Sequence, residues 1–268
     1  KVSQLKSMNF FKGLGTYFDK VQRMRKLGAV ISDELLISKE KVELSATICK
    51  TDLISEIVGE FPELQGIMGG HLSFVQGFDK EIVDAIKEQY LPIGQESIVP
   101  KKPFSIALSL SDKIDTLTGF FGINETPSSS KDPYALRRVA LGIIRIIIEN
   151  KKNIKINDLF SYSKNIYLEQ GFKLSNEKLI KDISNFLKER FKNYLKENDF
   201  RYDIIDATTK TLDLNKVSLA YEKAKSLNKV INKKIGEDIV SSYKRVFNIL
   251  SSEVKNISEN LSNATDPG

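Results

Sequence analysis

The sequence predicts an all-α protein built as two helical domains. Apolar residues recur at spacings of three and four along most of the chain, whereas the alternating pattern of a half-buried strand is scarce. With 268 residues, 41% of them hydrophobic and 28% charged, the chain can bury a core in each of two domains of ordinary size. Glycine and proline gather early, since 12 of the 15 glycines and 6 of the 7 prolines precede residue 151. The first part should therefore be broken often by turns, and the second should run in longer helices.

The first helix is expected to end at a glycine. Phe18, Val21, Met24 and Leu27 follow helical spacing, and Gly28 can supply the stop. The later helices of the first part are expected over residues 43–58, 82–90, 106–121 and 133–150.

Local signals mark the ends of these later helices. Pro92 should close the helix over 82–90, and Ser105 is a plausible cap for the helix over 106–121. Asp132-Pro133 has the form of a helix start, with an aspartate N-cap and a proline at the first helical position.

A short, polar and basic segment at residues 151–156 marks the predicted domain boundary, which gives domains of residues 1–150 and 151–268. Beyond it, helices are expected over residues 156–170, 177–198, 204–209, 215–227 and 236–261. Phe186, Phe191 and Leu195 share one stripe of the second of these helices, so Phe191 is expected in the core.

The net charge of +6 lies in the second part. Residues 1–150 contain 19 Lys+Arg and 19 Asp+Glu, whereas residues 151–268 contain 22 and 16. A basic module joined to a neutral one indicates contact with a polyanion, for which RNA, DNA and an acidic membrane surface are candidates. A lysine-rich surface that simply faces water explains the charge equally well.

Neither a membrane span nor an export signal is expected. The longest strongly apolar window, residues 139–148, is interrupted by Arg145 and is too short to cross a bilayer. The first residues lack the apolar core of a signal peptide, and a start at Lys1 suggests a piece of a longer protein. We therefore expect no membrane partner and a cytoplasmic location. The single cysteine, Cys49, fits a reducing compartment and is expected to be a buried filler rather than a nucleophile.

One enzymatic alternative is a metal-dependent phosphohydrolase of the HD type, because Asp52, Asp112 and Asp115 are placed on predicted helices. That chemistry needs histidine ligands beside carboxylates, and the only histidine is His71, in what should be a glycine-rich loop. Asp112 and Asp115 stand at i, i+3 and can face one side of a helix. They could hold a cation, but capping and ion pairing, with Lys113 or Arg138 as partners, is the favoured interpretation. We expect no catalytic and no metal-binding residue in this chain.

The second part offers basic residues interleaved with aromatic ones, which is the pattern of an RNA-binding surface. Arg201 and Tyr202 stand together at a predicted helix start, where Tyr202 is a candidate for stacking on a base. Lys188 and Lys192 are candidate backbone contacts. The remaining candidates are Lys244, Arg245 and Asn248. Arg137 and Arg138 could touch RNA or form structural ion pairs.

Several stretches together resemble the beta subunit of the bacterial two-subunit glycyl-tRNA synthetase. The most specific is EFPELQGIMG at residues 60–69. The others lie, in compatible order, at residues 50–53, 56–59, 90–92, 111–117, 121–123, 127–138, 201–207 and 244–250. The resemblance covers nearly the whole chain. It departs from the family at Phe10-Phe11-Lys12, where the family usually has a histidine-containing segment, and at Tyr243, where asparagine is usual.

The resemblance implies an HD-like helical domain followed by an anticodon-binding helical bundle that stops before its usual C-terminal end. It further implies that the beta subunit holds tRNA(Gly), while the separate alpha subunit uses ATP and Mg to attach glycine. This chain would then bind no cofactor itself. An alternative is a module that docks the alpha subunit without touching RNA. Residues 60–69 are expected to form a structural turn whose path is fixed by its proline and glycines.

Overall fold

The computed structural model describes residues 1–250 apart from 232, 235, 237, 239–240 and 244. The all-α prediction is confirmed, and the strands among the described residues are a short antiparallel pair, β1 (Asn9–Phe11) and β2 (Gly15–Thr16). The α-helices are α1 (Tyr17–Leu35), α2 (Lys39–Ile48), α3 (Glu56–Glu60), α4 (Ile67–Val75), α5 (Lys80–Glu88), α6 (Pro103–Gly122), α7 (Leu136–Glu149), α8 (Ile156–Glu169), α9 (Leu179–Glu197), α10 (Tyr202–Lys210) and α11 (Val217–Ile231). Short 3-10 helices are η1 (Val2–Ser7), η2 (Thr51–Ile54), η3 (Pro62–Leu64) and η4 (Leu214–Lys216).

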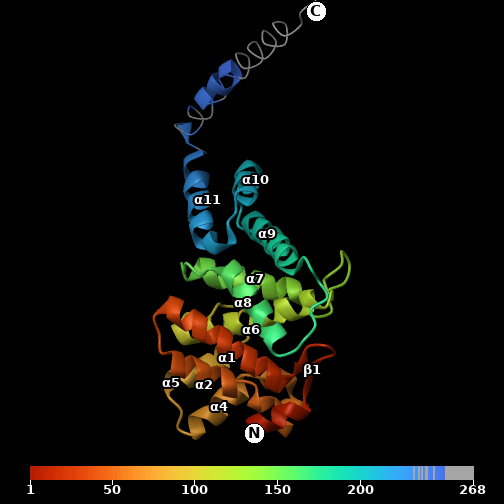
Figure 1. Cartoon of the computed structure of the whole chain (residues 1–268). Coiled ribbons are helices and arrows are strands. Elements are labelled where there is room, and N and C mark those ends of the chain that lie inside the picture. The colour runs from red at the N-terminus through yellow and green to blue at the C-terminus, as the bar shows by residue number, and fades with distance from the viewer. Residues whose placement is uncertain (232, 235, 237, 239–240, 244, 251–268) are drawn as a thin grey trace, which may run out of the picture.

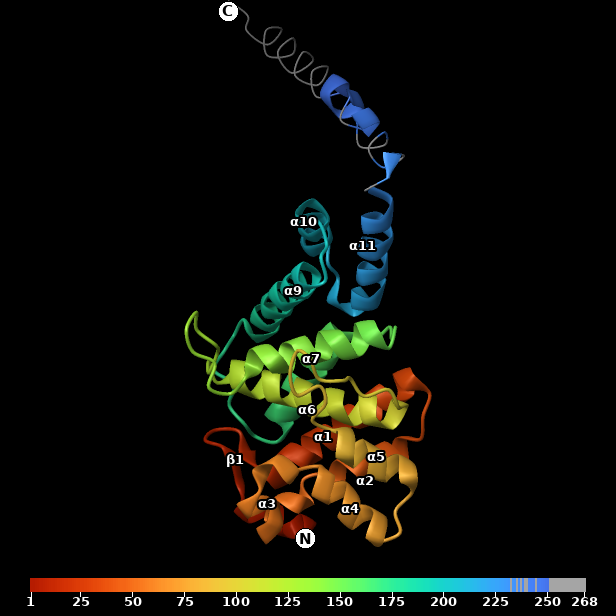
Figure 2. The same ribbon diagram turned by 180° about the vertical axis from the view of Figure 1, so that it is seen from behind.

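The helices stack in layers, with α3 and α4 at one end and α9 to α11 toward the other (Figures 1 and 2). Helix α1 packs on α2 and, on another side, on α6 and α8. Helix α7 lies on α6 and in turn carries α9 and α11. The segment after residue 151 therefore packs directly on helices that precede it.

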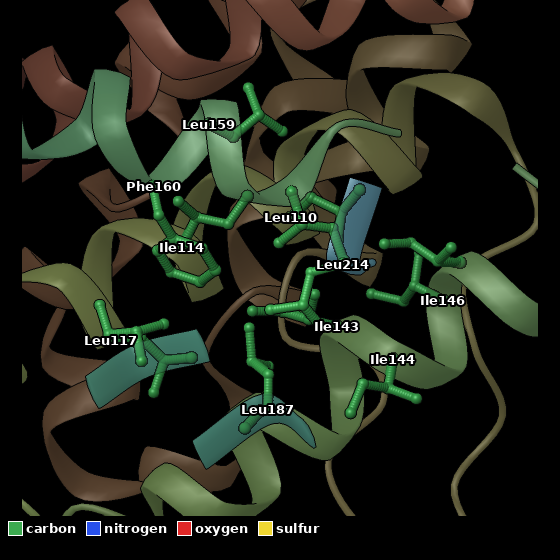
Figure 3. Packing of buried hydrophobic residues seen from close by; sticks show 14 of the residues in the cluster. Leu110, Ile114, Leu117, Ile143, Ile144, Ile146, Leu159, Phe160, Leu187 and Leu214 are labelled. Atoms are coloured by element: carbon green, nitrogen blue, oxygen red, sulfur yellow. The ribbon is translucent and has the colours of Figure 1, made fainter. Parts of the chain in front are cut away.

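One large buried cluster runs through this stack (Figure 3). Leu110 and Ile143 from the first part meet Leu159 and Leu187 from the second, and all are almost completely buried. A second cluster, which includes Val21, lies among α1, α2 and α5. Burying this apolar surface is the main force that holds the helices together. The division into domains at residue 151 stays a prediction, and the packing is continuous across it.

The prediction that Gly28 ends the first helix was wrong. Helix α1 continues past it and ends where Leu36 adopts a left-handed conformation. A Cβ on Gly28 would lie 2.7 Å from a methyl carbon of Val42, so glycine at this position lets α1 and α2 approach closely. Gly28 is therefore explained by close helix packing and not by the end of a helix.

The expected helix over residues 43–58 is also divided, since α2 ends at Ile48 and η2 and α3 follow. Ser105 lies fully buried inside α6, which begins at Pro103 after Lys102. Helix α7 begins later than predicted, but Asp132 still serves its start because its carboxylate accepts hydrogen bonds from the backbone N–H groups of Leu136 and Arg137 at 2.8 and 3.0 Å.

The turn at residues 60–69 is fixed by a buried carboxylate as well as by its own residues. Asp52 Oδ2 accepts hydrogen bonds from the N–H groups of Gly66, at 2.6 Å, and Gly69, at 3.0 Å. Gly66 has a φ of 81°, which favours glycine. Asp52 thereby satisfies free donors at the amino end of α4. His71 was expected in a loop but lies within α4, exposed to solvent.

Candidate RNA-binding surface and buried charge cluster

Helix α9 separates core residues from basic ones along its length. Phe191 is fully buried, as predicted, and Leu187 and Leu195 share its face. Lys188 and Lys192 stand at i, i+4 and are half-buried, so their aliphatic stems lie along the helix while their ammonium groups can reach solvent. The helix thus presents a basic edge beside its buried stripe.

Tyr202 and Lys192 form the centre of this surface. Tyr202 is the first residue of α10, and 68% of it is exposed. Lys192 Nζ lies 5.8 Å from the centre of the Tyr202 ring. An exposed aromatic face next to a cation provides the two elements that bind single-stranded nucleic acid, stacking for a base and charge for a phosphate.

Arg201 precedes Tyr202 and is held by a neighbouring carboxylate. Its guanidinium donates to both carboxylate oxygens of Asp203, at 2.8 and 3.2 Å. These hydrogen bonds lower the pKa of Asp203. The Arg201 and Asp203 side chains are about half exposed, and exposed ion pairs contribute about 0–1 kcal/mol. A phosphate could therefore take over part of the Arg201 guanidinium at small cost. We call Lys188, Lys192, Arg201 and Tyr202 the α9–α10 surface.

Two further candidates, Arg245 and Asn248, lie apart from this surface. Arg245 and Asn248 are exposed residues of a helical segment that lies beyond the end of α11, away from α9 and α10 in both views (Figures 1 and 2). Lys244 lies outside the described residues. The candidate residues thus form one local group of four and a separate pair.

The aspartates at 112 and 115 belong to a buried cluster of charges between α1, α2 and α6. Lys20 Nζ lies 2.9 Å from Asp112 Oδ1 and 3.0 Å from Asp115 Oδ2. Lys50 Nζ lies 3.2 Å from Asp112 Oδ2, and Arg23 donates from Nε to Asp115 at 2.5 Å. All five side chains are at most 12% exposed. The two carboxylates are ion-paired, as favoured from the sequence.

The partners named from the sequence were wrong, however. Lys113 Nζ points to the other side of α6, where it donates to the carbonyls of Tyr90 and Leu91 and to Ser109 Oγ. Arg138 forms no ion pair or hydrogen bond within the part of the chain that the structure describes. The ion pairs of Asp112 and Asp115 are therefore formed by residues of α1 and the end of α2 and not by the neighbouring Lys113.

The charge balance of the cluster keeps Asp112 ionised. Burial by itself would raise the pKa of Asp112, but the attraction of Lys20 and Lys50 outweighs it and holds the pKa well below the usual range. In the same way, burial opposes the charge of Lys50, and Asp112 raises its pKa above the ordinary value. Ammonium and guanidinium groups thus occupy the carboxylate oxygens that a metal ion would need.

Among the described residues, no group of three or more His, Cys, Asp or Glu side chains is placed to hold a metal ion. Asp52 is engaged at the amino end of α4. Cys49 is fully buried, as predicted, and burial raises the pKa of its thiol to about 12, which disfavours the reactive thiolate. No described helix is long and apolar enough to span a membrane.

Sequence reasoning missed Lys20, Arg23 and Lys50, because lysine and arginine on a helix are usually solvated. A signal was nevertheless present. Lys20 stands four residues before the buried Met24, and Arg23 is next to it. Lys50 directly follows the buried Cys49. A cation on an apolar stripe requires a buried anion, and Asp112 and Asp115 were the acidic pair in the longest apolar helix.

The structure therefore combines an all-α fold, a buried set of ion pairs and a basic, aromatic outer edge. A family model described as glycyl-tRNA synthetase beta subunit matches residues 1–210. A glycine–tRNA ligase beta subunit of Clostridioides difficile is 39% identical over 91% of this chain and 36% of its own length. One of Rickettsia canadensis is 40% identical over 94% of this chain and 36% of its own length. A third, of Rhodospirillum centenum, is 36% identical over 94% of this chain and 35% of its own length.

The chain belongs to the family of glycyl-tRNA synthetase beta subunits. It spans about a third of the length of the curated relatives it matches.

Proposed function

We propose that this chain is the tRNA-binding part of a glycine–tRNA ligase beta subunit. In this proposal it holds tRNA(Gly) in the cytoplasm while the separate alpha subunit attaches glycine with ATP and Mg²⁺, and it contributes no catalytic group or cofactor. The observation that carries the proposal is the Tyr202 ring, 68% exposed, with Lys192 Nζ 5.8 Å from its centre.

The α9–α10 surface supplies two kinds of contact that an RNA loop requires. Tyr202 offers a face on which an unpaired base can stack, and Lys192, Lys188 and Arg201 offer charge to the phosphates on either side. The excess of basic over acidic residues after residue 151 adds attraction at longer range. The division of labour with an alpha subunit is supported by the names of the relatives, which are all beta subunits.

The test measures binding of tRNA(Gly) to the complete beta subunit in complex with its alpha subunit, over a series of salt concentrations. Lys192→Ala should weaken binding and reduce the slope of log K against log salt by about one, because one phosphate contact is lost. Tyr202→Ala should weaken binding by about 1–3 kcal/mol, the value of one base stacked on an aromatic ring, while Tyr202→Phe should retain most of it. Lys80→Ala, an exposed lysine on α5, is the control.

The rival function is a module that docks the alpha subunit and does not touch RNA. Binding of the alpha subunit is therefore measured with the same variants. If Lys192→Ala and Tyr202→Ala leave tRNA binding unchanged, the α9–α10 surface is not the RNA site. If they instead weaken binding of the alpha subunit, the docking function replaces the one proposed.

A further inference from the structure

A second place with the chemistry of an RNA site lies in the first part of the chain. A cavity of about 670 Å³ opens between the start of α4, the segment that follows α5, the middle of α6 and the amino end of α7. Its lining includes the basic side chains Lys87, Lys113 and Arg138 and the aromatic rings of Tyr90 and Tyr134. This volume is in the range of pockets that hold small organic ligands, about 300–1,000 Å³.

Two of the basic side chains at the cavity have no ionic or hydrogen-bond partner among the described residues. Arg138 and Lys87 are both exposed, and neither forms an ion pair or hydrogen bond within the described part of the chain. The adjacent Arg137 differs, since its guanidinium donates to the carbonyl of Ser128 and lies 3.9 Å from a carboxylate oxygen of Asp132. Arg138 is thus the arginine at this helix start that remains available to an outside anion.

The exposed cations Arg138 and Lys87 supply the attraction of the cavity for an anion. Ala135, at the amino end of α7, also lines it, but there the Asp132 carboxylate already accepts hydrogen bonds from the N–H groups of Leu136 and Arg137. Behind the Asp112 wall, the buried cations of the described residues are Lys20, Arg23, Lys50 and Lys113, against the buried carboxylates Asp52, Asp112 and Asp115. Burial lowers the pKa of Lys113 to about 7, so this interior is close to neutral in charge. Glu63 is an acidic residue of the lining and is exposed.

A second hollow lies between the first turns of α7 and helix α9. It has a volume of about 220 Å³ and is lined by Arg137, Arg138, Arg190 and Asn193, with Glu197 at its acidic side. Arg138 lines both hollows. Arg190 pairs with Glu189 at 3.6 Å through one terminal nitrogen, but its Nε is buried without a hydrogen-bond partner. Arg138 and Arg190 therefore place two arginines between the cavity and helix α9.

We propose that the cavity binds one unpaired nucleotide of the RNA held at the α9–α10 surface. The phosphate lies against Arg138 and Lys87, and the base lies against the wall that Tyr90 and Tyr134 provide. An extended strand explains the second hollow, which a free nucleotide in the cavity would leave empty. The inference rests on the proposed function, because it takes the bound tRNA as the source of the strand.

The experiment uses the complete beta subunit with its alpha subunit and tRNA(Gly). It compares Arg138→Ala with Arg25→Ala, an exposed arginine of α1 outside both hollows. Acylation of the RNA 2′-hydroxyls reports which unpaired nucleotides the protein protects. Arg138→Ala should expose one single-stranded segment, leave the protection caused by the α9–α10 surface in place, and reduce the salt slope of binding by about one. Arg25→Ala should change none of these.

Further arms separate the alternatives. The four nucleoside 5′-monophosphates are titrated into the complex and into Arg138→Ala; if they bind in an Arg138-dependent way while tRNA protection is unaffected, the cavity serves free nucleotides and the RNA proposal is overturned. The RNA proposal is also overturned if Arg138→Ala changes neither the binding of the nucleoside monophosphates nor the protection of the tRNA. If Tyr202→Ala and Lys192→Ala have no effect but Arg138→Ala exposes a segment, the α9–α10 surface fails and the cavity stands. Thermal melting of each variant confirms that it is folded.

Discussion

Lys50 Nζ lies 3.2 Å from Asp112 Oδ2 in the interior of the first part, where the two side chains are 2% and 12% exposed. The aspartate shares a second partner, Lys20, and the ring of Tyr90 covers Lys50 with its centre 4.0 Å from the ammonium nitrogen. Charges so far from water are stable only while each retains its partner. Loss of one partner would leave a buried charge without its counter-charge.

Removal of one cation from this cluster should therefore be costly. Lys50→Met keeps the length of the side chain but leaves Asp112 with Lys20 alone, and we expect the free energy of unfolding to fall by about 3 kcal/mol. Denaturant titration of the purified chain measures it. Lys80→Met on the surface should stay within about 0.5 kcal/mol. Equal stability of the two variants would show that the buried pair contributes nothing net.

The free energy of unfolding should depend on pH through the ionisation of Asp112. Its pKa is lowered in the folded protein, so its contribution is present above the unfolded value, about 3.9, and is lost as pH falls below it. At pH 7, Asp112→Asn should lose about 3 kcal/mol relative to the natural chain. That difference should shrink steadily as the pH is lowered from about 5.

A matched control for this pH series is Asp79→Asn. Asp79 also pairs with a lysine, Lys41 at 2.9 Å, but its side chain is 60% exposed. The difference between Asp79→Asn and the natural chain should be small at every pH. A difference for Asp112→Asn that stays constant between pH 7 and pH 3 would mean that the carboxylate is not held ionised by its neighbours.

The contrast between what could and could not be predicted follows from distance along the chain. Periodicity and local signals found the helices, and Asp132 was recognised as serving the start of α7 because its partners lie only a few residues away. The partners of Asp112 lie 92 and 62 positions away, and local reasoning named the adjacent Lys113 instead. The tertiary fold alone decides which of several nearby cations meets a buried carboxylate.

The candidate RNA-binding residues show the same contrast between local signals and tertiary structure. A helical stripe separates Phe191 from Lys192 by simple geometry, and Phe191 was correctly placed in the core, whereas the RNA contact of Lys192 stays a prediction. The cavity at Arg138 could not be predicted, because it is assembled from α4, α6, α7 and the segment after α5. Composition identified the basic half of the chain, whereas this opening lies in the half whose charges balance.

Two glycines near the 60–69 turn should respond in opposite directions to alanine. At Gly69, a Cβ would lie 2.9 Å from Asp52 Oδ2, which is already fixed by the N–H groups of Gly66 and Gly69. Gly69→Ala should therefore destabilise the chain by about 1–3 kcal/mol. At Gly59 in α3 there is open space, and Gly59→Ala should be neutral or stabilise by up to about 1 kcal/mol. Thermal melting compares them, and a loss at both positions would contradict a specific role for Asp52.

The continuous packing across residue 151 leads to a prediction about cooperativity. Tyr167 on α8 has its ring centre 3.9 Å from the guanidinium carbon of Arg23 on α1. Its hydroxyl donates to the carbonyl of Asp115 on α6 at 3.2 Å. A residue of the predicted second domain therefore completes the environment of a charge cluster in the first.

Tyr167→Ala should accordingly destabilise both parts, by about 3–5 kcal/mol, because it leaves a large cavity and uncovers Arg23. Tyr167→Phe, which loses only the hydroxyl, should cost about 1 kcal/mol. Amide hydrogen exchange gives the decisive readout: in Tyr167→Ala, exchange should accelerate in α1 and α6 as well as in α8 and α9, since the helices open together. If exchange rises only after residue 151, the two parts unfold independently and the boundary drawn from the sequence is a boundary of stability too. Common acceleration would show instead that the division concerns function, with one cooperative core beneath the two candidate RNA sites.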